Sequence, residues 1–406
     1  MAFCYVCRES IVGMGWQGMS SKASGLTIAV AGIEAAEAGG AHIAENLMLS
    51  QIRDALVGDE LVILASDEKS WVATRAFRRL TNFFGNFRAI WRSQPVYWFI
   101  VRRFARLALT SFERDLLRKN VDLVFFVGPY DKALELKRIP YVATIWDLGH
   151  RDLPALPELV ANREFEYREW RIRDIAVKAL AVIVDSEPTK EKLQTYYGID
   201  ASRILVLPFP PNPSGTLHVS HRDSFALYPA HFWSHKNHIV LLQAIALLVG
   251  EGKQPRKLKL TGLDRGNLKY LLRRIDELGI SEHIDFLGFL SETDLHALYQ
   301  SAAIVVMPSM LGPTNLPPLE ALLRGCPVAV ARGARANLGD WQGVIELDAM
   351  DIAAWARILD QVSEFPKVQP DEIEGHLLAT KRSNVVKLQS LFAELRVMKN
   401  TYSFKD

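Results

Sequence analysis

The chain has 406 residues, which is too long for one typical hydrophobic core and predicts two domains. Its 48 lysines and arginines are balanced by 46 aspartates and glutamates, so the formal net charge of +2 gives no strong sign of nucleic-acid binding. Three cysteines exclude a disulfide framework and a four-cysteine zinc site, and such cysteine usage fits a reducing cytoplasm.

Residues 1–24 lack both a charged leader and a continuous apolar core, so we expect a mobile extension here and not a signal peptide. No apolar run approaches the length of about 18 residues that a membrane span needs. Cys4 and Cys7 lack the strand and helix context of a redox motif, and we interpret this pair as incidental. These features predict a cytoplasmic protein.

The first domain is expected to begin at residue 25 and to alternate short apolar strands with helices, which predicts a doubly wound α/β domain. Gly39 and Gly40 precede its first helix, where two glycines are either turn residues or a place where a ligand approaches the backbone. The predicted strands are 26–31, 61–65, 123–127, 141–145, 181–184 and 204–207, and the predicted helices are 42–56, 164–178 and 187–197.

The segment 75–119 has an unusual composition for this kind of domain. It carries eleven arginines and lysines against two acidic residues, interleaved with aromatic residues such as Phe83, Trp91 and Trp98. Basic groups with aromatic bodies are typical of a surface that binds anionic lipid, but the aromatic residues could equally face the core while the arginines stay solvated. No nucleic-acid-binding motif accompanies the charge.

Titratable residues gather after the strand 141–145, where Asp147 and His150 follow within a few positions. Open α/β sheets bind their ligands at the carboxyl ends of the strands. We therefore interpret His150 either as an active-site residue or as a capping or core histidine. Farther along the chain, Ser186 is predicted to cap the helix that ends at Tyr197.

A proline-rich linker over 208–215 predicts the domain boundary near residue 210. The second domain repeats the α/β pattern, with a helix from His238 and further helices over 317–324, 352–365 and 381–398. Its predicted strands are 225–228, 258–260, 284–286, 302–307, 328–330 and 344–345. His231, His235 and His238 lie close together but without an acidic neighbour, so we predict no metal site there.

In the stretch Met307–Arg332 the chain leaves an apolar strand, forms an irregular loop, and then continues into a helix and the next strand. Pro317 and Pro318 suit a first helical turn, because no backbone N–H partner is needed there. Free N–H groups and a positive helix end at the carboxyl edge of a parallel sheet bind phosphate well. Glu320 is expected in the first turn, where a carboxylate can be a helix-dipole partner and nothing more.

Residues 307–330 resemble the nucleotide-sugar loop of the retaining glycosyltransferases of family 4, whose usual form has two glutamates separated by seven residues. Glu320 matches the second glutamate, which holds the donor ribose in the family. Gly312 stands where the first glutamate would be. The run Gly-Pro-Thr-Asn-Leu-Pro-Pro-Leu-Glu over 312–320 is similar to one mannosyltransferase-like branch of the family.

The same resemblance implies roles for residues elsewhere in the second domain. Lys236 matches the lysine that binds the donor diphosphate, and His231 stands roughly where an arginine usually assists it. Gly288 begins a segment that in relatives holds the base. The complete donor-binding set that the resemblance implies is His231, Lys236, Gly288, Gly312, Pro313, Thr314, Asn315, Leu316 and Glu320.

In the first domain, Trp146 stands where the family usually has an active-site histidine, whereas Asp147 matches the family. His150 is close enough along the chain to substitute. Gly39 and Gly40 are similar to the glycine-rich acceptor-side loop of GT-B enzymes. The resemblance thus implies a catalytic set of Asp147, His150, Lys236 and Glu320.

The fold that the resemblance implies is α/β and of the GT-B type, with two Rossmann-like domains facing a cleft. They would span residues 25–210 and 211–380, and a final helix within 381–406 would cross back to the first domain. The implied activity is retaining transfer of a sugar, in surface polysaccharide synthesis, to a glycan or lipid-linked acceptor. GDP-mannose is the first choice of donor, with UDP sugars behind it.

No metal cofactor is expected, because Lys236, the N–H groups of Thr314 and Asn315, and the helix dipole would stabilise the departing diphosphate. Two alternatives stay open. The same fold hosts sugar-phosphate phosphorylases and epimerases, since a fold does not fix a function. Gly312 and His231 depart from the family pattern, so the second alternative is a catalytically silent module that binds nucleotide sugars.

Replacing Arg78, Arg79, Arg102 and Arg103 by Ser should release the protein from anionic vesicles in a low-salt co-sedimentation assay. Each basic residue near an anionic bilayer adds on the order of 1 kcal/mol of binding, so four outward-facing arginines are enough for reversible attachment. Nucleotide binding by the second domain should be unchanged. A wild-type protein that ignores anionic vesicles at low salt would refute the membrane interpretation.

Overall fold

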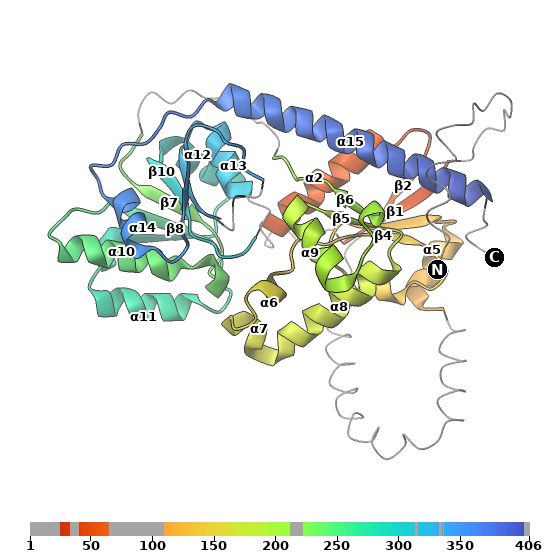
Figure 1. Ribbon diagram of the computed structural model, residues 1–406, viewed down its shortest axis with the longest axis horizontal. Helices are drawn as coiled ribbons and strands as arrows, with labels where there is room; N and C mark the ends of the chain where they lie inside the picture. The colour runs from red at the N-terminus through yellow and green to blue at the C-terminus, as the bar shows by residue number, and fades with distance from the viewer. Residues whose placement is uncertain are drawn as a thin grey trace, which may run out of the picture.

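The computed structural model describes residues 25–32, 40–64, 109–211, 222–312, 316–332, 335 and 337–401 of the chain. Two α/β domains lie next to each other, and one long helix runs from the second domain along the first (Figure 1). The expected fold class is confirmed, because each domain contains a six-stranded sheet of parallel strands. The predictions for residues 1–24 and for most of 75–119 lie outside the described residues.

The first sheet has the strand order β2-β1-β3-β4-β5-β6, all parallel. Its strands are β1 (Thr27–Ala31), β2 (Glu60–Ile63), β3 (Leu123–Phe126), β4 (Tyr141–Thr144), β5 (Ala181–Val184) and β6 (Ile204–Val206). The helices are α2 (Gly40–Ala55), α5 (Ser111–Arg118), α6 (Gly149–Asp152), α7 (Pro157–Val160), α8 (Glu164–Lys178) and α9 (Glu187–Tyr197).

Both faces of this sheet are buried, as expected for parallel strands with helices on each side. Alternate residues of β3 point to opposite faces, so Phe125 packs with Met48 of α2, whereas Phe126 packs with Ile175 of α8. This burial explains why the strands read as continuous apolar runs in the sequence.

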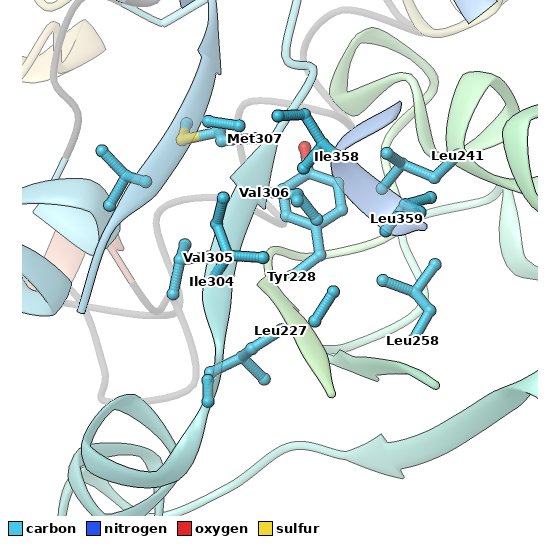
Figure 2. Close-up of a cluster of buried hydrophobic side chains, with 14 of the residues drawn as sticks. Leu227, Tyr228, Leu241, Leu258, Ile304, Val305, Val306, Met307, Ile358 and Leu359 are labelled. Atoms are coloured by element: carbon cyan, nitrogen blue, oxygen red, sulfur yellow. The ribbon is translucent and has the colours of Figure 1, made fainter. Parts of the chain in front are cut away.

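The second sheet has the order β12-β11-β10-β7-β8-β9, again all parallel. Its strands are β7 (Ala226–Pro229), β8 (Leu258–Thr261), β9 (Ile284–Gly288), β10 (Ile304–Met307), β11 (Val328–Ala331) and β12 (Val344–Leu347). The helices are η5 (Ser234–Lys236, a single 3₁₀ turn), α10 (His238–Gly250), α11 (Leu268–Leu278), α12 (Glu292–Ser301), α13 (Leu316–Leu323) and α14 (Ile352–Leu359). Figure 2 shows part of the core, where Tyr228 and Val306 lie near Leu241 and Leu359 of the covering helices.

The last helix, α15 (Pro370–Thr401), joins the two domains by packing against both α13 and α2 (Figure 1). It begins at Pro370, before the predicted start at residue 381. Two ion pairs hold its far end to the first domain, namely Arg396 with the buried Asp59 and Lys399 with Asp122. The buried Asn384 donates hydrogen bonds to Gln51 Oε1 (2.8 Å) and to the Pro208 carbonyl (2.7 Å).

Three local predictions need correction. Ser186 precedes α9 but makes no side-chain capping bond; its Oγ donates to Asp185 Oδ1 and lies 2.9 Å from Thr189 Oγ1. α14 ends at Leu359, because Asp360 leaves the helical region, and does not continue to residue 365. Glu320 is the fifth residue of α13 and so lies beyond the first turn. Among the described helices, none is long and apolar enough to span a membrane.

Replacing Asn384 by Ala should lower the free energy of unfolding by about 1–3 kcal/mol, because two buried acceptors would lose their donor. Urea denaturation followed by circular dichroism measures this change. The matched control is Ser383→Ala at the preceding, exposed position of α15, which should stay close to wild type. Equal stability of the two variants would show that Asn384 does not fasten α15.

Candidate active site

The carboxyl edges of the two sheets lie on either side of a cavity of about 630 Å³. The first domain contributes Asp147, Leu148, Gly149, Asp152, Leu153, Pro188, Thr189 and Lys192 to its lining, and the second contributes Met310, Leu311, Gly312, Arg332, Arg335, Leu338 and Glu346. This is the place where open α/β sheets bind ligands. The cavity therefore contains Asp147 and Gly312, two of the residues predicted for the site.

Asp147 follows β4 at the point where the strand leaves the sheet. Its Oδ1 accepts a hydrogen bond from the Gly149 N–H at 2.8 Å, which fixes the turn into α6. Gly149 in turn lies close to the second domain, because a Cβ added there would be 2.7 Å from Leu311 Cδ1. The first domain thus presents Asp147 to the cavity at a point of tight contact between the domains.

Lys236 ends η5, two residues before the start of α10, and is half-buried beside the cavity. A Cβ added to Gly312 would lie 3.6 Å from its Nζ, so the ammonium group reaches the loop that lines the cavity. Burial lowers the pKa of Lys236 to about 8, although the nearby Asp147 carboxylate acts in the opposite direction. An anion bound here would offset the cost of this desolvation, because a nearby negative charge favours the charged form of the lysine.

His231 does not supply the cation that its predicted role requires. Its Nδ1 accepts a hydrogen bond from the Leu263 N–H at 2.9 Å, so this ring nitrogen carries no proton. The ring also stacks on Phe289, with the centroids 6.4 Å apart. Phe289 follows Gly288, whose carbonyl accepts from Gly262 N and Thr261 Oγ1 at the end of β9. His231 therefore orders the segment predicted to hold the base.

Glu320 is buried between α12 and α13, where its Oε2 accepts a hydrogen bond from the Tyr299 hydroxyl at 3.0 Å. Burial raises the pKa of Glu320, and the bond from Tyr299 and the charge of Arg324 offset this only in part. The helix-dipole interpretation fails, because the carboxylate lies beyond the first turn of α13. Burial of a carboxylate lowers the stability of the fold, so its presence is typical of a binding site and not of a purely structural position.

His150 points away from the cavity, and the structure places it in the core of the first domain. Its ring is 1% exposed, and Nε2 lies 3.2 Å from Glu169 Oε2. Glu169 also binds Arg151 and accepts from Tyr197. α6 turns the histidine toward α8, so His150 is a buried residue of the first domain and is not among the residues that line the cavity.

Leu316, which is also predicted for the donor site, has a buried side chain. It is 3% exposed and packs in the hydrophobic cluster that contains Leu388 and Phe392 of α15, so it helps to join the domains. Gly40 begins α2, as predicted for the acceptor-side loop. Gly39, Pro313, Thr314 and Asn315 lie outside the described residues.

Several charged residues of the cavity were not predicted. Lys192 of α9 lies 2.6 Å from Asp152, while Arg332 and Arg335 bind the two oxygens of Glu346. Lys192, Asp152, Arg332 and Arg335 share a signal in their position, since each follows the carboxyl end of a strand within one helix or loop, whereas Glu346 lies inside β12. No group of three or more histidine, cysteine, aspartate or glutamate side chains suited to a metal occurs in the described part of the chain.

Comparison with known proteins covers both domains. Residues 64–212 match the family described as Glycosyltransferase Family 4, and residues 217–369 match the family described as Glycosyl transferases group 1. Over 257 residues, 57% of this chain and 31% of the relative, the chain is 35% identical to the serotype-specific mannosyltransferase WbdA of Escherichia coli. Over 130 residues, 30% of this chain and 31% of the relative, it is 34% identical to the D-inositol 3-phosphate glycosyltransferase of Corynebacterium urealyticum. The chain spans about a third of the length of these curated relatives.

Solved structures with the same architecture share little sequence with this chain. The apo form of the lipopolysaccharide outer core galactosyltransferase WaaB has a TM-score of 0.57 at 15% identity, over 92% of this chain and all of that one (100%). HepE of Anabaena in complex with UDP and glucose has a TM-score of 0.55 at 17% identity, over 91% of this chain and 98% of that one. Identity this low shows the fold alone.

A Glu320→Gln variant should be more stable than wild type at pH 7, because glutamine keeps the acceptor for Tyr299 but needs no buried charge. The raised pKa means that the folded state holds its proton to higher pH than the unfolded chain does. Wild-type stability therefore falls as pH rises from the unfolded pKa through the folded pKa, and the advantage of the variant should vanish in acid.

Unfolding temperatures measured from pH 4 to pH 8 test this prediction. The control is Glu282→Gln, which changes an 82% exposed glutamate of the same domain. A glutamine variant of Glu320 that unfolds at a lower temperature than wild type at pH 7 would contradict it.

Proposed function

Since this chain belongs to family 4 of the glycosyltransferases and has the GT-B fold, we propose that it transfers a sugar from a nucleotide-diphosphate sugar with retention at the anomeric carbon. The observation that carries the proposal is Lys236, a half-buried ammonium group beside the side-chain-free Gly312 and within electrostatic reach of Asp147. A site of this kind suits a ligand that carries concentrated negative charge next to a polar, uncharged group.

The chemistry follows from where charge develops. In glycosyl transfer the bond between the anomeric carbon and the diphosphate oxygen breaks, so negative charge builds on the leaving diphosphate. Lys236 would stabilise that charge in surroundings where water is largely displaced, and the positive amino-terminal end of α13, which begins four residues after Gly312, would add to this stabilisation. This stabilisation makes a divalent metal unnecessary in the proposed mechanism.

The donor is held by the second domain in this proposal. Glu320 would bind the ribose hydroxyls, and the segment after Gly288, ordered by His231, would hold the base. Gly312, with a backbone φ of +109°, replaces a glutamate of the usual family pattern and leaves room for the donor next to Lys236. Sequence similarity to mannosyltransferases supports GDP-mannose, and the UDP complex of HepE supports UDP sugars as the second choice.

The acceptor is proposed to be a glycan or a lipid-linked saccharide of surface polysaccharide synthesis, bound by the first domain at the cytoplasmic side of the membrane. Mannosyltransferase and lipopolysaccharide galactosyltransferase relatives support this class. Asp152 and Lys192 line that side of the cavity as an ion pair, a combination that can both donate to and accept from sugar hydroxyls.

Incubation with GDP-mannose and with UDP sugars, each with and without mannose-containing acceptor oligosaccharides, tests the proposal. Acceptor-dependent release of the nucleoside diphosphate, with a new glycosidic bond of retained configuration, is the expected result. Sugar-phosphate formation from inorganic phosphate would favour a phosphorylase, and a changed sugar stereocentre would favour an epimerase. Tight GDP or UDP binding without turnover on any glycan or lipid extract would favour a silent binding module.

Lys236→Ala should lower the transfer rate about 100-fold or more, roughly 3 kcal/mol, which is typical of one preorganised electrostatic contact. In the wild type, GDP or UDP binding measured by calorimetry should weaken as pH rises through about 8, because the lysine loses its charge there. The control is Lys253→Ala, at an exposed lysine of the same domain. Full activity of the Lys236 variant would remove Lys236 from the mechanism.

A further inference from the structure

One carboxylate of the first domain binds directly beside the lysine of the second. Glu158 lies in the short helix α7, and its Oε1 accepts a hydrogen bond from the His235 backbone N–H at 3.0 Å. The same oxygen lies 2.9 Å from Nδ1 of the His235 ring. Glu158 thus holds both the main chain and the side chain of a residue whose immediate neighbour is Lys236.

The Glu158 carboxylate is largely buried in this contact between the domains. Its side chain is 10% exposed, and Oε2 is buried with no hydrogen-bond partner among the described residues. Burial raises the pKa of Glu158, but the hydrogen bonds from His235 outweigh it and lower the pKa to about 2. Glu158 is therefore ionised, and Nδ1 of His235 is the proton donor in the pair.

His235 also connects to the loop that lines the cavity. Its carbonyl accepts a hydrogen bond from the Met310 N–H at 2.9 Å, two residues before Gly312. The next residue after Lys236 is Asn237, which has a left-handed backbone (φ 54°) and donates to the Pro308 carbonyl at 3.2 Å. These two hydrogen bonds couple the conformation of η5 to the 308–312 loop. Glu158 contacts η5 from the first domain.

We propose that Glu158 is a positioning residue for the transfer reaction: by binding His235 across the domain interface it fixes η5 so that Lys236 faces Asp147 when the domains are together. This inference rests on the proposed function. Among the described residues, Glu158 makes its hydrogen bonds to His235 and not to a predicted donor or acceptor group, so it acts through His235. Parting of the two domains would break both hydrogen bonds and expose the carboxylate to water, so the contact exists only in the closed arrangement.

The first test measures the arrangement of the domains and needs no turnover. Spin labels on Val177→Cys of α8 and Leu247→Cys of α10, both exposed, report the distance between the domains in a background that carries Cys4→Ser and Cys7→Ser. Electron–electron double resonance is recorded with and without UDP or GDP. Glu158→Ala should broaden the distance distribution and shift it to longer values.

The matched control is Glu164→Ala, which removes an ion pair with Arg168 inside α8 and contacts no residue of the second domain in the described structure. It should reproduce the wild-type distribution. If Glu158→Ala also reproduces it, the proposal is overturned, whether or not the protein proves to be a glycosyltransferase.

The second test uses the donor that the protein turns over. Glu158→Ala should lower kcat at least about tenfold, since small misplacements of a catalytic group have large effects, while Kd for GDP or UDP stays within about twofold. Glu158→Gln should recover much of the rate, because its amide oxygen can accept the His235 N–H. A purely structural role would instead lower the unfolding temperature and affect kcat and Kd alike.

A double-mutant cycle with His235→Ala separates the pair from its surroundings. Adding His235→Ala to Glu158→Ala should cause no further loss of kcat, because Glu158→Ala already removes both hydrogen bonds. Additive losses, or an unchanged kcat in Glu158→Ala, would overturn the positioning role. Absence of turnover with every donor would refute the proposed function and leave the distance measurement to decide on Glu158.

Discussion

A positive charge that is only partly solvated lies at the centre of this structure. Lys236 is enclosed at the edge of the second sheet, and no carboxylate forms an ion pair with its Nζ in the described part of the chain. In the free protein, desolvation makes the charged form of Lys236 unfavourable, and a bound anion makes the charged form favourable again. The hydroxyl of Tyr228, a core residue, donates a hydrogen bond to the Lys236 carbonyl at 2.6 Å. This bond fixes the backbone at Lys236 despite the unfavourable desolvation of its side chain.

The site is formed by two domains, so its geometry depends on how the domains are joined. α15 fastens the second domain to the first along α2, through Asn384 and the ion pair of Arg396 with the buried Asp59. Close to the cavity the contact is smaller, with Gly149 against Leu311 and Glu158 against His235. A strong junction far from the site and a small polar contact next to it suit a cleft that opens and closes.

Where this chain departs from the usual family pattern, neighbouring residues change the role of the position. His231 stands in place of an arginine, and its ring accepts a backbone N–H and stacks on Phe289, so it orders a loop and carries no charge toward the cavity. Gly312 replaces a carboxylate next to Lys236, which removes a counter-charge and leaves the lysine available. Trp146 replaces a histidine, and its side chain packs with the apolar cluster of the first domain.

The sequence by itself determined most of the secondary structure and the general location of the site. Short apolar runs such as Ala181–Val184 and Val328–Ala331 are typical of buried parallel strands, and Pro317 and Pro318 allow a helix to start but not to continue through them. Local steric and burial constraints of this kind act within a few residues, and they can be inferred without knowing the fold. Asp147 was predicted near a ligand site for a similar reason, because it follows the end of a strand, whereas Lys236 and Gly312 were predicted from the resemblance to the family.

Only the tertiary structure decided where individual side chains point and which domain each contacts. His150 and Asp147 are three positions apart, yet α6 turns one toward Glu169 and leaves the other at the cavity. Glu320 lies one residue farther into α13 than expected, against Tyr299 of a different helix. Glu158 carries no sequence signal, because its partner His235 is 77 positions away and in the other domain. Such contacts depend on the packing of elements that are distant in the chain, and no local pattern encodes them.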